Sequence, residues 1–284
     1  MPTDTPLNLP FTYPRVLSIA GSDSGGGAGI QADLKTISAL GCFGMTAITA
    51  LTAQNTCGVR SIHGVPPQML ADQIDAVLED IGVDAVKIGM LHSPEIVLTV
   101  AMAIERHALP QVVFDPVMVA TSGATLITSD AIDVLVRELF PRAALITPNL
   151  DEAALLVKRP LLSESAMEAA ATELLAMGAQ AVLLKGGHLA GDTVSDVLAL
   201  PGGRRVWMRD ARIATPNTHG TGCTLSSAIA SYLALGQELV QAVQSARNYI
   251  RGALLHGAQV RTGRGSGPLN HGYAPQTMVL RAPR

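Results

Sequence analysis

Charged and aromatic residues are scarce in the 284-residue sequence. Charged residues make up 15% of the chain, the formal net charge is −3, and no run of basic residues occurs. Nucleic acids and anionic membrane surfaces are bound mainly through clustered lysine and arginine, so neither is expected as a partner. Aromatic residues account for only 3%, which argues against a platform on which nucleic-acid bases stack.

Cysteine is also scarce, and long apolar runs are missing. Cys42, Cys57 and Cys223 are widely spaced and form no Cys-x-x-Cys pair, which excludes a disulfide framework and a structural zinc site and favours reduced thiols. Residues 1–14 contain four prolines and resemble neither a signal peptide nor a membrane anchor, so we expect a loose tail. Because no apolar run reaches membrane-spanning length uninterrupted, we expect a cytoplasmic protein.

Short apolar segments alternate with amphipathic ones almost throughout, no linker interrupts residues 15–260 and no repeat occurs, so we expect one domain over residues 15–284. Expected strands are 16–20, 45–51, 85–89, 112–115, 144–147 and 181–185, and expected helices are 28–40, 66–81, 94–107, 130–140, 151–157, 164–177, 221–235 and 238–256. Continuously apolar strands joined by helices predict a three-layer α/β/α sandwich around a mostly parallel sheet. Residues 194–213, with Pro-Gly-Gly at the centre, predict a β-hairpin.

Residues 217–224 read Asn-Thr-His-Gly-Thr-Gly-Cys-Thr and precede an apolar helical run. The N-terminus of a helix presents unpaired N–H groups and a partial positive charge, and glycine lets the backbone approach an anion closely. Gly220, Thr221 and Gly222 therefore predict an anion-binding site. Cys223 lies in the first helical turn, where the helix dipole is expected to favour its thiolate.

Polar residues that follow two early strands are candidates for contacts with a ring. The glycine-rich loop 21–29 matches neither a dinucleotide fingerprint nor a P-loop, and it is equally well read as a flexible turn or as backbone that approaches a flat ligand. The amide of Gln54 matches the edge of an amino-substituted heterocycle. Asp33 could accept a hydrogen bond from an amino or hydroxyl group. Taken alone, Gln54 is more simply interpreted as an amide that caps a loop, and Asp33 as a solvated residue of a helix.

Acids, an amide and a lysine follow the central strands. Asp115 and Glu152 suit Mg²⁺, which binds through one or two carboxylates together with phosphates. Asn149 and Glu152 also fit a capping box, in which they would begin a helix. Lys185 could reach a nucleotide phosphate or lie at the surface, and His188 is most simply a solvated loop histidine.

Taken together and in this order, these segments resemble the bacterial hydroxymethylpyrimidine and phosphohydroxymethylpyrimidine kinases of thiamine biosynthesis, within the ribokinase-like superfamily. The resemblance rests on residues 20–36, 49–56, 87–91, 115–118, 147–153, 184–188 and 217–224. It implies that Gln54 holds the pyrimidine, in a pocket also formed by Gly21, Asp33, Met90 and Val117. It also implies that residues 220–223 form the anion hole, with Cys223 as the base.

The same resemblance implies the remaining roles. ATP would contact Lys185, Asn149, Asp115 and Thr221, with Asp115 and Glu152 near Mg²⁺. The expected reaction is the ATP-dependent phosphorylation of 4-amino-5-hydroxymethyl-2-methylpyrimidine and of its monophosphate. Relatives are often dimers, so we expect a homodimer with an interface near residues 43–57. The alternatives are a pyridoxal or pyridoxine kinase and a catalytically silent pyrimidine or nucleotide sensor.

Overall fold

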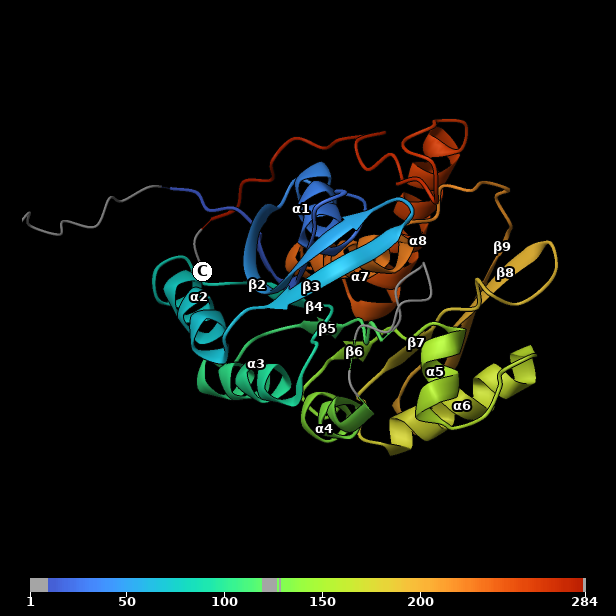
Figure 1. Ribbon diagram of the computed structural model, residues 1–284, viewed down its shortest axis with the longest axis horizontal. Helices are drawn as coiled ribbons and strands as arrows, with labels where there is room; N and C mark the ends of the chain where they lie inside the picture. Colours follow the sequence, from blue (N-terminus) through green and yellow to red (C-terminus); the bar gives the residue numbers. More distant parts are fainter. Residues whose placement is uncertain (1–9, 119–126, 128, 283–284) are drawn as a thin grey trace, which may run out of the picture.

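The computed structural model describes residues 10–118, 127 and 129–282. These residues form a nine-stranded sheet in the order β3-β2-β1-β4-β5-β6-β7-β8-β9 (Figure 1). The strands are β1 (Arg15–Asp23), β2 (Phe43–Asn55), β3 (Gly58–Gly64), β4 (Ala85–Ile88), β5 (Val112–Phe114), β6 (Leu145–Ile146), β7 (Val182–Leu184), β8 (Thr193–Ala199) and β9 (Arg205–Ala211). The run from β2 to β7 is parallel, whereas β3, β8 and β9 pair antiparallel. The predicted mostly parallel sheet is confirmed.

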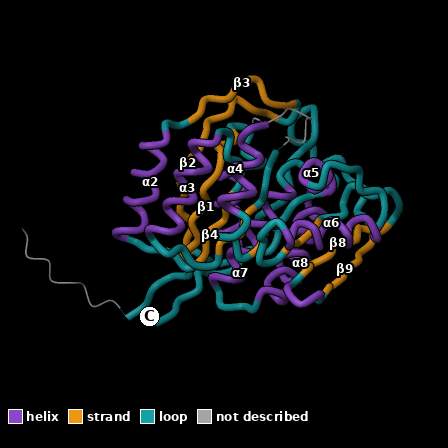
Figure 2. Tube along the Cα trace, turned by 90° about the horizontal axis from the view of Figure 1, so that it is seen from below, coloured by secondary structure: helices purple, strands orange, loops and turns teal. Residues whose placement is uncertain are grey.

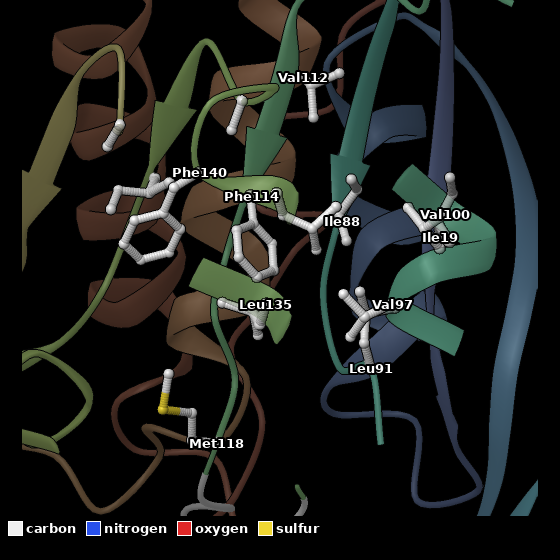
Figure 3. Close-up of a cluster of buried hydrophobic side chains, with 14 of the residues drawn as sticks. Ile19, Ile88, Leu91, Val97, Val100, Val112, Phe114, Met118, Leu135 and Phe140 are labelled. Carbon is white, nitrogen blue, oxygen red and sulfur yellow. The ribbon is translucent and has the colours of Figure 1, made fainter. Parts of the chain in front are cut away.

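Helices cover both faces of the sheet (Figure 2). They are α1 (Gly29–Ala39), α2 (Pro67–Asp80), α3 (Pro94–Arg106), α4 (Ser129–Leu139), α5 (Leu150–Leu156), α6 (Glu164–Ala176), α7 (Thr221–Ala234) and α8 (Leu239–Gly257). One buried cluster packs the sheet against α2 to α6, and a second packs it against α1, α7 and α8. Phe114 of β5 meets Phe140 edge to face in the first cluster (Figure 3). The predicted three-layer sandwich follows from these two cores.

The local sequence explains where several helices begin. Ser93 accepts the N–H of Ile96 and so caps α3, and a proline occupies the first position of the same helix. The central strands are short and apolar because helices bury both of their faces. Lys87 of β4 is the exception, because it is a charged residue whose side chain is nevertheless fully buried.

One edge of the sheet differs from the expected strands. The sequence analysis did not predict β3, whose residues Arg60, Ser61 and His63 are exposed. This edge strand lacks the apolar alternation on which strand prediction depends. Because β2 continues to Asn55 and pairs with β3, Gln54 lies within a strand rather than after one. The hairpin predicted at residues 194–213 is confirmed by β8 and β9.

The two ends of the described chain meet. Thr12 and Arg281 exchange two backbone hydrogen bonds of 2.8 and 3.0 Å, and the N–H of Val279 donates to the carbonyl of Gly41 at 2.9 Å. Residues 1–9 of the expected loose tail lie outside the described residues, whereas the part from Thr12 onward is paired. Among the described helices, none combines the length and apolarity required to cross a membrane.

Candidate active site

A cavity of about 360 Å³ opens at the carboxyl edge of the parallel strands. In open α/β sheets this edge is where ligands bind. Every candidate residue from the sequence analysis except Asp33 lines the cavity, namely Gly21, Gln54, Met90, Asp115, Val117, Asn149, Glu152, Lys185, Gly220, Thr221, Gly222 and Cys223. The fold therefore brings together residues as far apart in the sequence as Gly21 and Cys223. Crossover helices between parallel strands return the chain to the same edge of the sheet each time.

The N-terminus of α7 forms one wall of the cavity. Gly220 caps the helix with a φ of 84°, a left-handed conformation that favours glycine. A Cβ on Gly220 would lie 1.9 Å from the carbonyl oxygen of Gly27, so the loop before α7 and the glycine-rich loop after β1 are in close contact. The first-turn N–H groups of a helix have no intrahelical partner. This wall can therefore receive an anion.

Lys185 and Asp115 face that helix end. The ammonium group of Lys185 donates to Oδ1 of Asp115 at 2.8 Å, and Thr147 donates to the same oxygen at 2.9 Å. A Cβ on Gly222 would lie 3.3 Å from both Nζ of Lys185 and Oδ2 of Asp115. Burial disfavours the ammonium form, yet the carboxylates of Asp115 and Glu152 hold the pKa of Lys185 above its ordinary value. The lysine therefore remains a cation beside the helix end.

Glu152 and Asn149 form the capping box that begins α5. Asn149 accepts the N–H of Glu152 at 2.9 Å, and its own N–H donates to the Glu152 carboxylate at 2.8 Å. Glu152 is only 3% exposed, and its burial raises its pKa to about 7. The negative charge of Asp115 also raises this pKa, whereas the positive charge of Lys185 lowers it. Glu152 therefore caps α5 and also lines the cavity.

The donor set near Glu152 fits Mg²⁺ only in combination with a bound phosphate. Asp115 and Glu152 supply two carboxylates at this part of the cavity, and within the described residues no group of three or more His, Cys, Asp or Glu side chains could hold a metal ion. Mg²⁺ binds proteins through one or two carboxylates, while substrate phosphates and water complete its shell. The site therefore matches a metal that arrives with a nucleotide.

Cys223 is a free thiol in the first turn of α7. Its burial raises the pKa to about 11, and the carboxylates of Asp33 and Asp115 act in the same direction against the nearby charge of Lys87. The expectation of a favoured thiolate is wrong, because desolvation by burial outweighs the charge of Lys87, which favours the thiolate. A thiol with a pKa of about 11 is protonated at neutral pH.

Asp33 does not line the cavity, contrary to its expected contact with the substrate. Its Oδ2 accepts hydrogen bonds from Lys87 at 2.8 Å and Ser18 at 2.5 Å, and its Oδ1 accepts from Ser227 at 2.6 Å. Lys87 lines the cavity in its place. The sequence analysis missed this lysine, and a charged residue inside an apolar strand was the available signal.

A second pair that sequence reasoning missed lies beside Gln54. Nε2 of His219 is 2.9 Å from Oδ2 of Asp23 and 3.4 Å from Nε2 of Gln54. Asp23 also accepts backbone N–H groups of the glycine-rich loop, from Gly25, Gly27 and Ala28. Although burial opposes the charged form, His219 and these N–H groups lower the pKa of Asp23. The glycine-rich loop is therefore wrapped around the carboxylate of Asp23.

Solved structures of small-molecule kinases resemble this fold. The chain matches a phosphomethylpyrimidine kinase of Clostridium difficile with a TM-score of 0.74 and 43% identity, over 84% of this chain and 99% of that one. It matches a pyridoxal kinase of Bacillus subtilis, solved as an ADP complex, with a TM-score of 0.83 and 35% identity, over 92% of this chain and 98% of that one. With the site described above, these similarities make the chain a kinase of the ribokinase-like class.

The family within that class follows from the sequence comparisons. A family model described as phosphomethylpyrimidine kinase matches residues 23–270, and the chain belongs to this family. A hydroxymethylpyrimidine/phosphomethylpyrimidine kinase of Rhizobium meliloti is 49% identical over 256 residues, which are 90% of this chain and 96% of that protein. The thiamine biosynthesis bifunctional protein ThiED of Geobacter sulfurreducens is 52% identical over 92% of this chain, which spans about half of that protein, 53% of its length.

Proposed function

We propose that the protein transfers the γ-phosphoryl group of ATP to the hydroxymethyl group of 4-amino-5-hydroxymethyl-2-methylpyrimidine, and then phosphorylates the resulting monophosphate. The observation that carries this proposal is the single cavity that holds Gln54 together with the N-terminus of α7 and Lys185. The amide of Gln54 can form hydrogen bonds with the edge of a ring, and the N-terminus of α7 can bind an anion. Their presence in one cavity suits a small alcohol that accepts a phosphoryl group. The name of the Rhizobium meliloti relative supports the same substrate. The name of the Geobacter sulfurreducens relative supports a role in thiamine biosynthesis.

In this proposal the phosphoryl group moves in line between two oxygens. In the first step the oxygen of the substrate hydroxyl group attacks the γ-phosphorus, the bond to the β–γ bridging oxygen breaks, and ADP leaves. The hydroxyl proton passes to an oxygen of the transferred phosphoryl group or, where Cys223 is ionised, to its thiolate. Phosphoryl transfer is catalysed mainly by positioning and by charge stabilisation. The N–H groups at residues 220–223 hold the moving phosphoryl oxygens, and Lys185, Asn149 and Thr221, which line the same cavity, contact the ATP phosphates. Asp115 and Glu152 would hold Mg²⁺, which supplies further positive charge when bound.

Cys223 acts on the attacking alcohol. Because burial keeps its pKa at about 11, the thiol first orients the hydroxyl group. Proton acceptance requires the thiolate, which the charge of Lys87 favours. Full turnover of a Cys223→Ser enzyme under conditions where chemistry limits the rate would remove the role of the sulfur in proton transfer.

The pyrimidine end of the cavity is tested at Gln54. We expect Gln54→Ala to raise the KM for the pyrimidine at least tenfold, about the worth of one well-formed hydrogen bond, and to leave the KM for ATP within twofold, about the level of noise in such assays. Equal changes in both Michaelis constants would contradict the assigned pocket. Absence of ADP production by the unmodified protein, with intact binding of both ligands, would instead favour a catalytically silent sensor.

Pyridoxal kinase activity is the second candidate. Pyridoxal kinases of Staphylococcus aureus and Bacillus subtilis match this fold with TM-scores of 0.84 and 0.83, and pyridoxal also carries a hydroxymethyl group on a nitrogen heterocycle. Turnover measured side by side on the pyrimidine alcohol and on pyridoxal, with the same Mg-ATP, separates the two activities. We expect a higher kcat/KM for the pyrimidine, since the named relatives of higher identity act on it.

The remaining expectations extend this proposal. Residues 15–284 would act as one kinase domain in the cytoplasm, and two copies would pair near residues 43–57, at the end of the sheet where β2 and β3 lie. Phe43, Leu51 and Ile62 at this edge are each at least 39% exposed. Light scattering coupled to size exclusion measures the oligomeric state, and a monomer at micromolar concentration would contradict the dimer.

A further inference from the structure

The residue after Lys185 is tied to a buried carboxylate on the neighbouring strand. The N–H of Gly186 donates to Oδ1 of Asp196 at 2.8 Å, and Asp196 in β8 is 6% exposed. A Cβ on Gly186 would lie 1.9 Å from the carbonyl oxygen of Ser195, so the backbone here presses against β8. The carboxylate therefore holds the peptide unit that joins Lys185 to Gly186.

Arg247 of α8 holds the other oxygen of the same carboxylate. Its Nε donates to Oδ2 of Asp196 at 2.9 Å, while its remaining nitrogens bind Asp210 at 2.9 Å and the carbonyl of Met208 at 3.1 Å. Arg247 is only 4% exposed. A buried carboxylate is tolerated when it is paired and its oxygens are satisfied. Arg247 both neutralises Asp196 and leaves one oxygen directed at Gly186.

Lys185 is thus held from two sides. Its own N–H donates to the carbonyl of Pro148 at 2.9 Å, and the next N–H along the chain donates to Asp196. Its ammonium group then reaches Asp115, beside the first turn of α7. Small displacements of a group that positions a reactant have large effects on rate, and about 1 Å can cost about 10²-fold.

We propose that Asp196 and Arg247 are positioning residues for phosphoryl transfer, which set the backbone from which Lys185 extends toward the ATP phosphates. The proposal rests on the proposed contact of Lys185 with ATP. It concerns two residues that do not line the cavity and would otherwise be taken as packing between α8 and the β8–β9 hairpin.

Asp210 supplies a matched control for Asp196. Both carboxylates bind Arg247, but the Asp210 side chain is 30% exposed, and it pairs with Arg247 and Arg251 rather than with the turn after β7. An asparagine at position 196 can accept with only one end of its amide, so it loses either the Gly186 or the Arg247 contact. An asparagine at position 210 weakens the ion pair alone.

The experiment compares Asp196→Asn with Asp210→Asn by steady-state kinetics, by calorimetric affinity for a non-hydrolysable ATP analogue, and by thermal unfolding. We expect Asp196→Asn to weaken analogue binding and to lower kcat/KM for ATP about 10- to 100-fold, with the KM for the pyrimidine within about twofold of wild type. Asp210→Asn should leave both ATP readouts unchanged. If the two variants behave alike, or if Asp196→Asn lowers only the unfolding temperature, the proposal is overturned.

Two further variants keep the outcome clear. Arg247→Lys retains a cation beside Asp196, so it should show the same ATP-selective defect in weaker form; a normal analogue affinity in this variant would also overturn the proposal. Lys185→Met tests the underlying function separately. If Lys185→Met loses analogue affinity while Asp196→Asn does not, the role of Lys185 stands and the positioning role fails. If Lys185→Met binds the analogue normally, the ATP contact itself is wrong.

Discussion

Nζ of Lys87 lies 2.8 Å from Oδ2 of Asp33, and both side chains are fully buried beneath the cavity. Burial alone would discharge the lysine, but the carboxylate of Asp33, together with that of Asp115, holds the pKa of Lys87 above its ordinary value. Lys87 also lines the cavity that holds Cys223. The pair therefore places a fixed positive charge at the floor of the active site and a balancing negative charge behind it.

Removal of one partner of this pair should be more damaging than removal of both. Lys87→Met leaves the Asp33 carboxylate buried with only hydroxyl donors, and we expect it to lower the free energy of unfolding by about 3–5 kcal/mol. The double variant Lys87→Met/Asp33→Leu removes the uncompensated charge and should recover a large part of that loss. Urea unfolding of the three proteins measures the difference. A double variant as unstable as the single one would contradict the ion-pair interpretation.

Gly220→Ala should disrupt the anion-binding end of α7. The residue has a φ of 84°, and an added Cβ would lie 1.9 Å from the carbonyl oxygen of Gly27, so the helix end must move. We expect a loss of kcat/KM for ATP of at least about 10²-fold, the effect of losing one aligned N–H donor. Gly236 is the matched control, because its φ is 92° but no atom lies within 4 Å of an added Cβ.

Gly236→Ala should therefore show backbone strain without a catalytic defect. A left-handed conformation costs an L-residue about 1–2 kcal/mol, which thermal unfolding measures, and kcat and both KM values should match wild type. If Gly236→Ala lost as much activity as Gly220→Ala, general destabilisation would explain both results and the anion-binding role of Gly220 would fail.

The sequence predicted those parts of the fold and site that depend on local patterns. Strands such as β4 and β5 are apolar because they are buried on both faces, so their runs are visible without a structure. Asp115 and Lys185 could be grouped because the carboxyl ends of parallel strands share one edge. β3 was missed because an exposed edge strand with Arg60, Ser61 and His63 carries no buried face to pattern it.

Pairings between distant residues could not be read from residue types. Asp33 is a candidate hydrogen-bond acceptor in any sequence, and only the structure shows that its carboxylate turns to Lys87, 54 positions along the chain. His219 and Asp23 are 196 positions apart and meet because two glycine-containing loops touch. Burial also reversed the expectation for Cys223, since the desolvation of a thiol depends on neighbours that the sequence does not place.

The ion pairs at Asp84 should make stability depend on pH. Asp84 accepts hydrogen bonds from the backbone N–H of Arg15 at 2.8 Å and from its Nε at 3.1 Å, and it contacts Arg281. Burial opposes ionisation, but the two guanidinium groups outweigh it and lower the pKa of Asp84. A lowered pKa in the folded state contributes stability that is present above the unfolded pKa and is lost as the pH falls through the folded value.

Asp84→Asn should accordingly lower the unfolding temperature at pH 7, and the difference from wild type should shrink as the pH falls below 4, near the ordinary carboxyl pKa. Arg137→Gln serves as the control, because its ion pair with Glu138 is exposed and such pairs contribute little. A difference between Asp84→Asn and wild type that stayed constant from pH 7 to pH 3 would mean that the arginines do not act on Asp84 through its charge.

Alkylation should report the protonation state of Cys223. A thiol with a pKa of about 11 exposes little thiolate at pH 7, so iodoacetamide should modify it slowly, with a rate that rises about tenfold per pH unit up to pH 10. The measurement uses Cys57→Ser protein, since Cys57 is exposed and would react in parallel, while Cys42 is buried. The variant Cys57→Ser/Cys223→Ser gives the background rate. A rate that levels off by pH 8 would show that the cavity stabilises the thiolate, and Cys223 could then accept the proton of the alcohol without first losing its own.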